Sequence, residues 1–370
     1  MRSFKDLIKE VHKKGICQQC GGCVSFCNSI EHHVIGFADP FQPPQYLHQD
    51  QCLKCGLCYL ICPQTHQLEE ELNEEYNFTN FEEMPMGFSY NIHSCQATDP
   101  DFLRHGTDGG VLNSILNYLL EKGEIDGAIV AKSVAPFVRE SFIARNKEDL
   151  LEASGLTLDV SPQLDEIQKF HTYTRSLPKL KQFQFKKLAV VGTPCQLYTI
   201  RCMQNLGISP SENITLCLGL FCYENFLFDR DKIQEFEQEF ELKFEEIEKL
   251  NIKEDMILSI KSKESGSRDV HIPFKRLDPY MRPACRACED FTNIYADISF
   301  GGLGSEEKYS TVISRSEKGR SIILKAENTG IINCKSLSYA DKKKIKALIA
   351  QYSRSKVDRK KKFFDSLWEK

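Results

Sequence analysis

Two cysteine runs near the N-terminus share one spacing that is typical of iron–sulfur ligands. Each run reads C-x2-C-x2-C-x3-C, and only the second ends in Cys-Pro. Three thiolates at this spacing can hold three corners of one [4Fe–4S] cubane, and in two-cluster ferredoxins the fourth cysteine of each run completes the other cluster. The predicted ligands of one cluster are Cys17, Cys20, Cys23 and Cys62. Those of the other are Cys52, Cys55, Cys58 and Cys27.

Structural zinc is the alternative for these runs, because zinc sites also use paired C-x2-C motifs. Zinc gives no reason for a third regularly spaced cysteine or for the Cys62-Pro63 step. Asn28 takes the place of that proline in the first run and removes no ligand. The pattern therefore favours two iron–sulfur clusters.

A second set of cysteines lies further along the chain. Cys195 and Cys222 each follow an apolar run that we expect to be a strand, and Cys285 with Cys288 forms a C-x2-C motif. Strand ends meet at one edge of a sheet, where α/β proteins place their sites. These four thiols therefore predict a third metal centre, either a cluster or zinc. The remaining cysteines have no partner at short spacing and need no function as small buried residues: Cys95, Cys202, Cys217 and Cys334.

A glycine-rich loop directly precedes a helical pattern at residues 111–122. The loop comprises Gly106, Thr107, Asp108, Gly109 and Gly110. Glycines at a helix N-terminus let backbone amides and the helix dipole meet a phosphate, although an ordinary capped turn explains them equally well. The loop is neither a P-loop nor a dinucleotide GxGxxG motif, so nothing here indicates NAD. His105, beside the loop, is the one histidine with a candidate role, and no catalytic residue is assigned.

Composition narrows the class of protein. A chain of 370 residues suits two or three domains, and a net charge of −4 gives no support to nucleic-acid binding. The apolar runs are too short to span a bilayer, and the N-terminus lacks a secretory h-region. We therefore expect a cytoplasmic protein, and in a reducing compartment its 16 cysteines point to cofactors rather than disulfides.

The chain divides into four predicted parts and an α+β fold. Residues 1–67 form a bacterial-type two-cluster ferredoxin domain, and residues 68–86 form an acidic linker or a solvated short helix. Residues 87–340 form an α/β body, and residues 341–370 form a basic amphipathic helix. That last helix either caps the body as a solvated surface or docks to a partner or lipid surface.

Apolar periodicity places the elements of the body. Strands are expected at residues 128–131, 188–192 and 214–221, with paired strands in 256–274 and further strand character in 296–315. Helices are expected at residues 111–122, 195–206 and 229–249.

Taken in order, the body motifs resemble the beta-subunit family of coenzyme F420-reducing hydrogenases and F420 dehydrogenases. The resemblance spans about residues 85–330 and includes the glycine loop, Gly192-Thr193-Pro194-Cys195-Gln196, and the segments that carry Cys222, Cys285 and Cys288. It implies a bound FAD, with residues 106–110 as its phosphate loop. It also implies a nearby [4Fe–4S] cluster held by Cys195, Cys222, Cys285 and Cys288.

The resemblance further implies an F420-dependent oxidoreductase that exchanges hydride with coenzyme F420 and passes single electrons through its clusters. Its partners would be other redox subunits of a multi-subunit complex, and peripheral docking to a membrane-bound complex stays open. One segment departs from the family pattern: Leu156-Thr157-Leu158 stands before Ser161-Pro162, where we expect a small residue, a basic residue and a tyrosine. Two alternatives follow, an electron-relay subunit fed only by protein partners such as ferredoxin, hydrogenase or heterodisulfide-reductase-type complexes, and a ferredoxin-dependent reductase of another substrate.

Overall fold

The body is built on an eight-stranded mixed sheet with the strand order β13-β3-β12-β11-β7-β6-β4-β5. The computed structural model describes residues 2–29, 33–39, 42–135, 138–155, 185–262 and 266–368. The strands are β3 (Asn91–Ala97), β4 (Gly127–Ala135), β5 (Val138–Ala144), β6 (Leu188–Gly192), β7 (Ile214–Leu220), β11 (Ile298–Gly301), β12 (Ser310–Ser314) and β13 (Ile332–Cys334). The four central strands β4, β6, β7 and β11 are parallel, and the flanking strands pair antiparallel.

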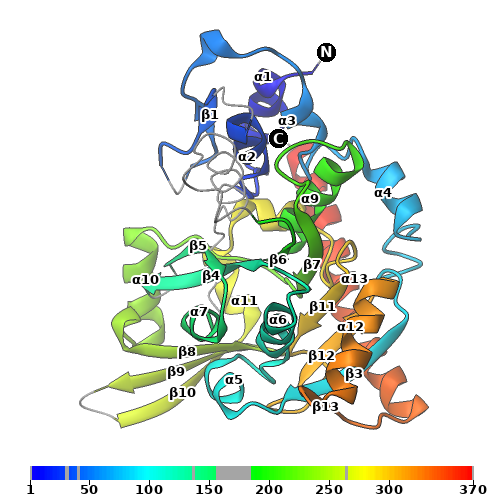
Figure 1. Cartoon of the computed structure of the whole chain (residues 1–370). Helices are drawn as coiled ribbons and strands as arrows, with labels where there is room; N and C mark the ends of the chain where they lie inside the picture. The colour runs from blue at the N-terminus through cyan, green and yellow to red at the C-terminus, as the bar shows by residue number, and fades with distance from the viewer. Residues whose placement is uncertain are drawn as a thin grey trace.

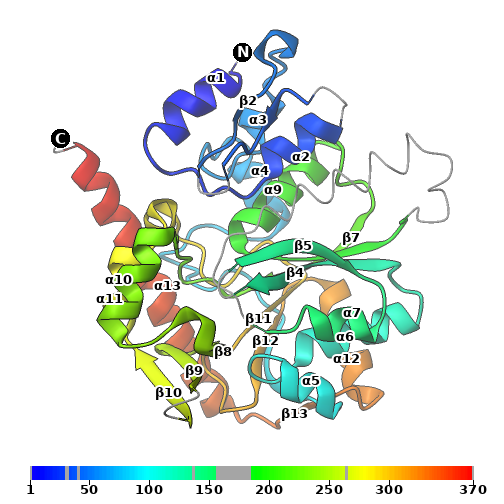
Figure 2. The same ribbon diagram turned by 90° about the vertical axis from the view of Figure 1, so that its left-hand side faces the viewer.

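Helices cover both faces of this sheet, which explains why its central strands are continuously apolar. All five residues of β6 are buried. Along β4, Ala128 and Val130 join the core under one set of helices, whereas Ile129 joins the core on the opposite face. The first set is α5 (Pro100–His105), α6 (Val111–Glu121), α7 (Lys147–Glu152) and α12 (Glu317–Asn328). The opposite face packs against α9 (Pro194–Asn205) and α13 (Tyr339–Trp368) (Figure 2).

A smaller antiparallel sheet lies beside the main one (Figure 1). It comprises β8 (Ile247–Ile252), β9 (Met256–Ser262) and β10 (Gly266–Ile272), and it shares an aromatic core with α10 (Arg230–Phe240). The helix expected at residues 229–249 is therefore too long. Glu241 takes a left-handed φ of 52°, and the chain then enters β8, where Leu250 pairs with Leu258 of β9. Sheet pairing and burial override the local helical pattern there.

The N-terminal region sits on top of the body in Figure 1. It contains α1 (Phe4–Leu7), a π-helical turn (Ile8–His12), α2 (Gly22–Ser29), α3 (Leu57–Leu60) and a small hairpin of β1 (Ile35–Gly36) and β2 (Gln45–Tyr46). Short helices elsewhere are the 3-10 turns Gln49–Gln51, Phe244–Glu246, Asp278–Tyr280 and Pro283–Ala287, with α11 at Phe274–Leu277.

The acidic segment of residues 68–86 contains a short helix, which was one of the two expectations. The segment packs against the rest of the protein and is not simply a solvated linker. It forms α4 (Glu69–Glu75), whose Leu72 is fully buried. Leu72 lies in one hydrophobic cluster with Phe26 of the N-terminal region and Tyr198 of α9. The segment therefore joins the cysteine-rich region to the body through side-chain packing.

The basic C-terminal segment is helical as expected, but it is not only a solvated surface. Helix α13 packs Ile345 and Ile349 against the main sheet and brings Phe363 and Phe364 to the N-terminal region (Figures 1 and 2). Its Lys356 is 1% exposed. None of the described helices is long and apolar enough to cross a membrane.

A disulfide joins Cys95 of β3 to Cys334 of β13, two residues that face each other across the strand pair. For this pair, the expectation that the cysteines serve cofactors rather than disulfides is therefore wrong. They lie 239 residues apart, and only the register of two edge strands brings them together.

A buried ion pair joins α9 to Asp297, the residue directly before β11. The Arg201 guanidinium lies 3.0 Å from the Asp297 carboxylate, and both side chains are 11% exposed. The same carboxylate accepts the Cys217 amide at 2.8 Å. We predict that Arg201→Met lowers the free energy of unfolding by about 3–5 kcal/mol, because it leaves a buried carboxylate without its cation.

Anaerobic urea unfolding at matched iron content measures this loss. Lys325→Met is the control, because its pair with Glu124 is exposed and worth at most about 1 kcal/mol. Burial by itself raises the pKa of Asp297, but Arg201, the Cys217 amide and Ser316 hold it below its usual value. This stabilisation is present above the carboxyl's unfolded pKa and is lost as the pH falls through its lower folded pKa. Equal stabilities of the two variants would contradict the prediction.

Candidate cofactor sites

The eight N-terminal cysteines gather in two groups of four. Besides burial, the thiolate charges of Cys20, Cys17, Cys58 and Cys62 raise the pKa of Cys23, so Cys58 of the other group also lies near it. Burial and the charges of Cys55, Cys27 and Cys52 raise the pKa of Cys58 to about 12. The structure therefore brings Cys62 to the first run and Cys27 to the second. This is the crossed arrangement that the spacing predicts, and ligation itself stays a prediction.

Both runs repeat one backbone conformation around their second cysteine. Gln19 and Gly21 have φ of 51° and 82° on either side of Cys20, and Lys54 and Gly56 have φ of 53° and 80° on either side of Cys55. Left-handed residues within such short turns aim successive amides into one concavity that favours anionic groups. This conformation suits the sulfides and thiolates of a cluster.

Burial makes these thiols poor anions unless a cation is bound to them. It raises the pKa of Cys17 to about 12 and also raises the pKa of Cys20 and Cys62. Metal ligation requires thiolates, so a cationic cluster core would supply the charge that the surroundings lack. The residues therefore fit the predicted clusters.

The third set of cysteines also converges, at the carboxyl ends of β6 and β7. Burial raises the pKa of Cys195, and the charges of Cys288 and Cys222 add to that rise, as Cys288 does at Cys285. The Asn225 backbone amide donates to Cys285 Sγ at 3.3 Å, and its side-chain amide donates to Cys222 Sγ at 3.3 Å. Amide donors to sulfur are a common feature of iron–sulfur sites.

The distances between the thiols can be compared with those of a zinc site. Tetrahedral Zn–S bonds of about 2.3 Å hold sulfur ligands about 3.8 Å apart. Among the residues that the structure describes, the one trio of His, Cys, Asp or Glu ligand atoms that all lie within 4.8 Å is His93, Cys95 and Cys334. No three thiols of a predicted ligand set meet that limit, and the choice between a cluster and zinc stays a prediction.

Contacts made by residues next to the thiols link the third set of cysteines to the first N-terminal group. Cys20 Sγ lies 3.6 Å from Thr199 Oγ1 on α9, one turn after Cys195, and the charge of Cys20 adds to the burial that raises the pKa of Cys195. Arg282, which is 3% exposed, donates to the Gln19 side chain. Burial raises the pKa of both Cys17 and Cys285, and the positive charge of Arg282 opposes the rise at both. A buried cation thus lies between the two thiol sets.

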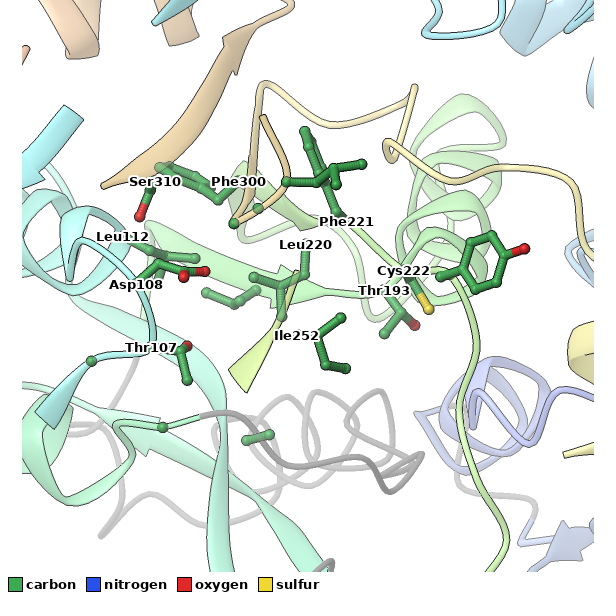
Figure 3. Close-up of a pocket in the computed structure, with 18 of the residues that line it drawn as sticks. Thr107, Asp108, Leu112, Thr193, Leu220, Phe221, Cys222, Ile252, Phe300 and Ser310 are labelled. Atoms are coloured by element: carbon green, nitrogen blue, oxygen red, sulfur yellow. The ribbon is translucent and has the colours of Figure 1, made fainter. Parts of the chain in front are cut away.

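A cavity of about 210 Å³ lies next to the third set. Figure 3 shows Thr107 and Asp108 at one side of it and Cys222 with Thr193 at the other. The carboxyl ends of β6, β7 and β11 form its floor, together with the N-terminus of α6. The parallel strands thus place a pocket and a set of four thiols at one sheet edge.

The glycine loop shapes this pocket, and four of its five predicted residues line it. Gly110 has a φ of +65°, and a Cβ there would lie 2.4 Å from the Phe102 carbonyl oxygen. Gly109 faces away from the pocket lining, and a Cβ there would lie 2.6 Å from the Cys95 carbonyl oxygen. His105 lies outside the pocket lining and contacts the Asp101 carbonyl at 2.9 Å.

Residues from distant segments complete the pocket. Lys253, from the turn between β8 and β9, brings Nζ to 3.8 Å from Asp108 Oδ1. Burial raises the pKa of Asp108, and Lys253 opposes that rise. Lys253 and Asn225 line the cavity but were assigned no role from the sequence, because no local motif marks them. The segments around Leu156-Thr157-Leu158 and Ser161-Pro162 lie outside the described residues.

Comparisons with known proteins agree with this geometry. Residues 92–168 match the model of the coenzyme F420 hydrogenase/dehydrogenase beta subunit N-terminal part, and residues 185–339 match the model of its C terminus. The coenzyme F420 hydrogenase subunit beta of Methanothermobacter thermautotrophicus is 30% identical over 260 residues, 69% of this chain and 87% of that one. The chain therefore belongs to the coenzyme F420 hydrogenase/dehydrogenase beta subunit family.

Two further relatives extend the comparison. The coenzyme F420-dependent sulfite reductase of Methanocaldococcus jannaschii is 29% identical over 331 residues, which are 85% of this chain but only 46% of the reductase. A solved structure of the F420-reducing [NiFe] hydrogenase complex from Methanosarcina barkeri contains a chain with a TM-score of 0.66 and 27% identity. The match covers 76% of this chain and 93% of that chain.

The glycine loop yields a test with a control on the same helix. Gly110→Ala forces a Cβ against the Phe102 carbonyl at the N-terminus of α6. If residues 106–110 are the phosphate loop of a bound FAD, as the family resemblance implies, we predict that this variant loses most of its flavin. Gly123→Ala, at the other end of α6, has the same backbone problem, with a φ of +64°, but open space around its Cβ. An alanine at position 123 would have to adopt a left-handed backbone conformation, which costs about 1–2 kcal/mol. Residue 123 does not line the pocket.

Flavin per chain is measured after anaerobic purification of both variants and of the wild type. Full flavin in Gly110→Ala would remove the loop from the flavin site. Equal loss in both variants would assign the effect to the helix as a whole.

Proposed function

We propose that the chain is an iron–sulfur flavoprotein subunit that exchanges hydride with coenzyme F420 and passes single electrons to or from a partner protein. One observation carries the proposal: a single cavity reaches from the glycine loop at the N-terminus of α6 to Cys222, a member of the third thiol set. A cofactor in this cavity would contact a phosphate-binding loop at one end and an electron acceptor at the other.

The residues support FAD in this cavity. The α6 N-terminus and the Lys253 ammonium supply positive potential for a pyrophosphate, and Leu112, Leu220 and Phe300 supply an apolar wall. FAD, when bound, accepts a hydride as an electron pair and releases electrons one at a time, which is what a cluster can accept. The chain itself would position FAD between its hydride donor and the third thiol set.

The arrangement of thiols supports an order for the electron route. The set of Cys195, Cys222, Cys285 and Cys288 adjoins the cavity, and Cys20 of the first group adjoins that set. The second N-terminal group follows the first on this route. Its Cys55 is exposed, and the nearby Leu53 is 66% exposed. We propose that electrons leave or enter there, so that residues 1–67 act as a ferredoxin-type domain facing the partner.

The relatives of this chain support a class of partner protein rather than one particular protein. The chain resembles a subunit of an F420-reducing hydrogenase complex and less than half of an F420-dependent sulfite reductase. The first of these is named as a subunit of a hydrogenase, and the second as a reductase that is longer than this chain. We therefore propose another redox subunit as the partner, with residues 87–340 as the flavin- and cluster-binding body.

Anaerobic mixing with reduced F420 tests the function. We predict that stoichiometric reduced F420 bleaches the flavin absorption and then the broad cluster absorption, while NADH in equal amount bleaches neither, because the chain has no dinucleotide motif. The Gly110→Ala protein, depleted of flavin, should keep its clusters oxidised.

Two results would overturn the hydride assignment. Failure of reduced F420 to reduce a flavin-replete protein, combined with rapid reduction by a reduced ferredoxin, would favour the electron-relay alternative. Reduction of the clusters in flavin-free protein would contradict the proposed route.

A further inference from the structure

The last helix inserts a buried lysine into the third thiol set. Lys356 on α13 is 1% exposed, although lysines are almost never fully buried without partners. Its ammonium donates to the Cys222 carbonyl at 2.7 Å, the Asp290 carbonyl at 2.5 Å and Cys288 Sγ at 3.3 Å. These three contacts use all three donors of the ammonium group. All three partners belong to the segments that carry the body cysteines.

The charge of Lys356 is not matched by the two carbonyls. A neutral carbonyl oxygen satisfies a hydrogen bond but does not cancel a buried positive charge. The third partner, Cys288, is a predicted cluster ligand and would carry negative charge when it binds iron. The buried carboxyls of Asp290 and Glu224 also face this charge, but Cys288 and Cys222 act on Lys356 more strongly than Asp290 does. With iron bound, the thiolates of the set would therefore be the main counter-charge of Lys356.

The neighbouring cation on the same helix is different. Arg359 Nη1 donates to Glu224 Oε2 at 2.6 Å, and Nη2 donates to the Tyr223 carbonyl at 2.7 Å. The Glu224 side chain is 1% exposed and pairs with Arg359, which opposes the burial that raises the pKa of Glu224 to about 7. Arg359 thus fixes the Cys222 segment in place, whereas Lys356 leaves its charge for the thiol set.

We propose that Lys356 raises the reduction potential of the cluster held by Cys195, Cys222, Cys285 and Cys288 and so sets it as an acceptor of flavin electrons. One-electron reduction makes a four-thiolate cluster more negative, and a buried cation at contact distance stabilises that state more than the oxidised state. Charge and hydrogen bonds at the sulfurs are among the factors that determine such potentials. Lys356 is a positioning and electrostatic residue here, not a catalytic one. This inference rests on the third cluster of the proposed function but not on F420 as the donor.

The test is an anaerobic redox titration followed by EPR, with dithionite as the reductant and no F420. Lys356→Met removes the charge and leaves an unbranched side chain that is one atom shorter. Lys356→Gln also removes the charge but leaves an amide group that can donate to the carbonyls. Lys361→Met is the matched control, since Lys361 lies on the same helix and pairs with Glu82 at the surface. Iron per chain is measured for each protein.

We expect the ratio of reduced to oxidised body cluster at a fixed potential to fall at least about tenfold in both Lys356 variants, a midpoint shift of about 59 mV for one electron. The other two clusters serve as internal references, and Lys361→Met should match the wild type. An unchanged midpoint in a variant that keeps its iron would overturn the proposal. Loss of the body cluster from both variants would also overturn it, because the lysine would then serve assembly rather than potential. Failure of F420 reduction with the potentials as expected would affect the proposed function alone.

Discussion

The structure depends on one electrostatic constraint: twelve predicted cluster ligands are thiols held largely away from water, where an uncompensated thiolate is costly. Burial raises the pKa of most of these thiols, including Cys17, Cys23 and Cys195. Iron–sulfur cores would supply the positive charge that these thiolates need. The surrounding elements supply hydrogen-bond donors and further positive charge. Left-handed turns aim amides inward, Asn225 donates to two sulfurs, and Arg282 and Lys356 bring buried positive charge.

The same constraint explains why parts that are far apart in the sequence pack as one unit. Helix α13 carries Lys356 to the body thiols and Phe363 to the N-terminal region. Helix α4 fills the space between that region and α9. Each of these contacts holds one thiol group near the next, as the proposed transfer of electrons between them would require. Neither segment is therefore a passive linker or tail.

Local signals in the sequence predicted much of the site. Regular cysteine spacing indicated both N-terminal groups and their crossed membership, because the repeat itself encodes that geometry. Apolar runs at residues 188–192 and 214–221 predicted the strands that place Cys195 and Cys222 at one sheet edge. What escaped prediction depends on tertiary contacts. The Cys95–Cys334 disulfide, the Lys253 contact to Asp108 and the burial of Lys356 all join distant segments, and the end of α10 was decided by pairing in β8.

The central claim is that the body thiols connect the flavin pocket to the N-terminal clusters, and a Cys195→Ser protein tests it most directly. The matched control is Cys202→Ser, which changes a buried cysteine on the same helix outside every predicted ligand set. Iron analysis and anaerobic stopped-flow absorption with reduced F420 are recorded for both. The account predicts that Cys195→Ser loses about four irons per chain, keeps two clusters that dithionite reduces, and bleaches its flavin but not those clusters with reduced F420. Cys202→Ser should behave as the wild type. Wild-type rates of cluster reduction by reduced F420 in Cys195→Ser would contradict the account.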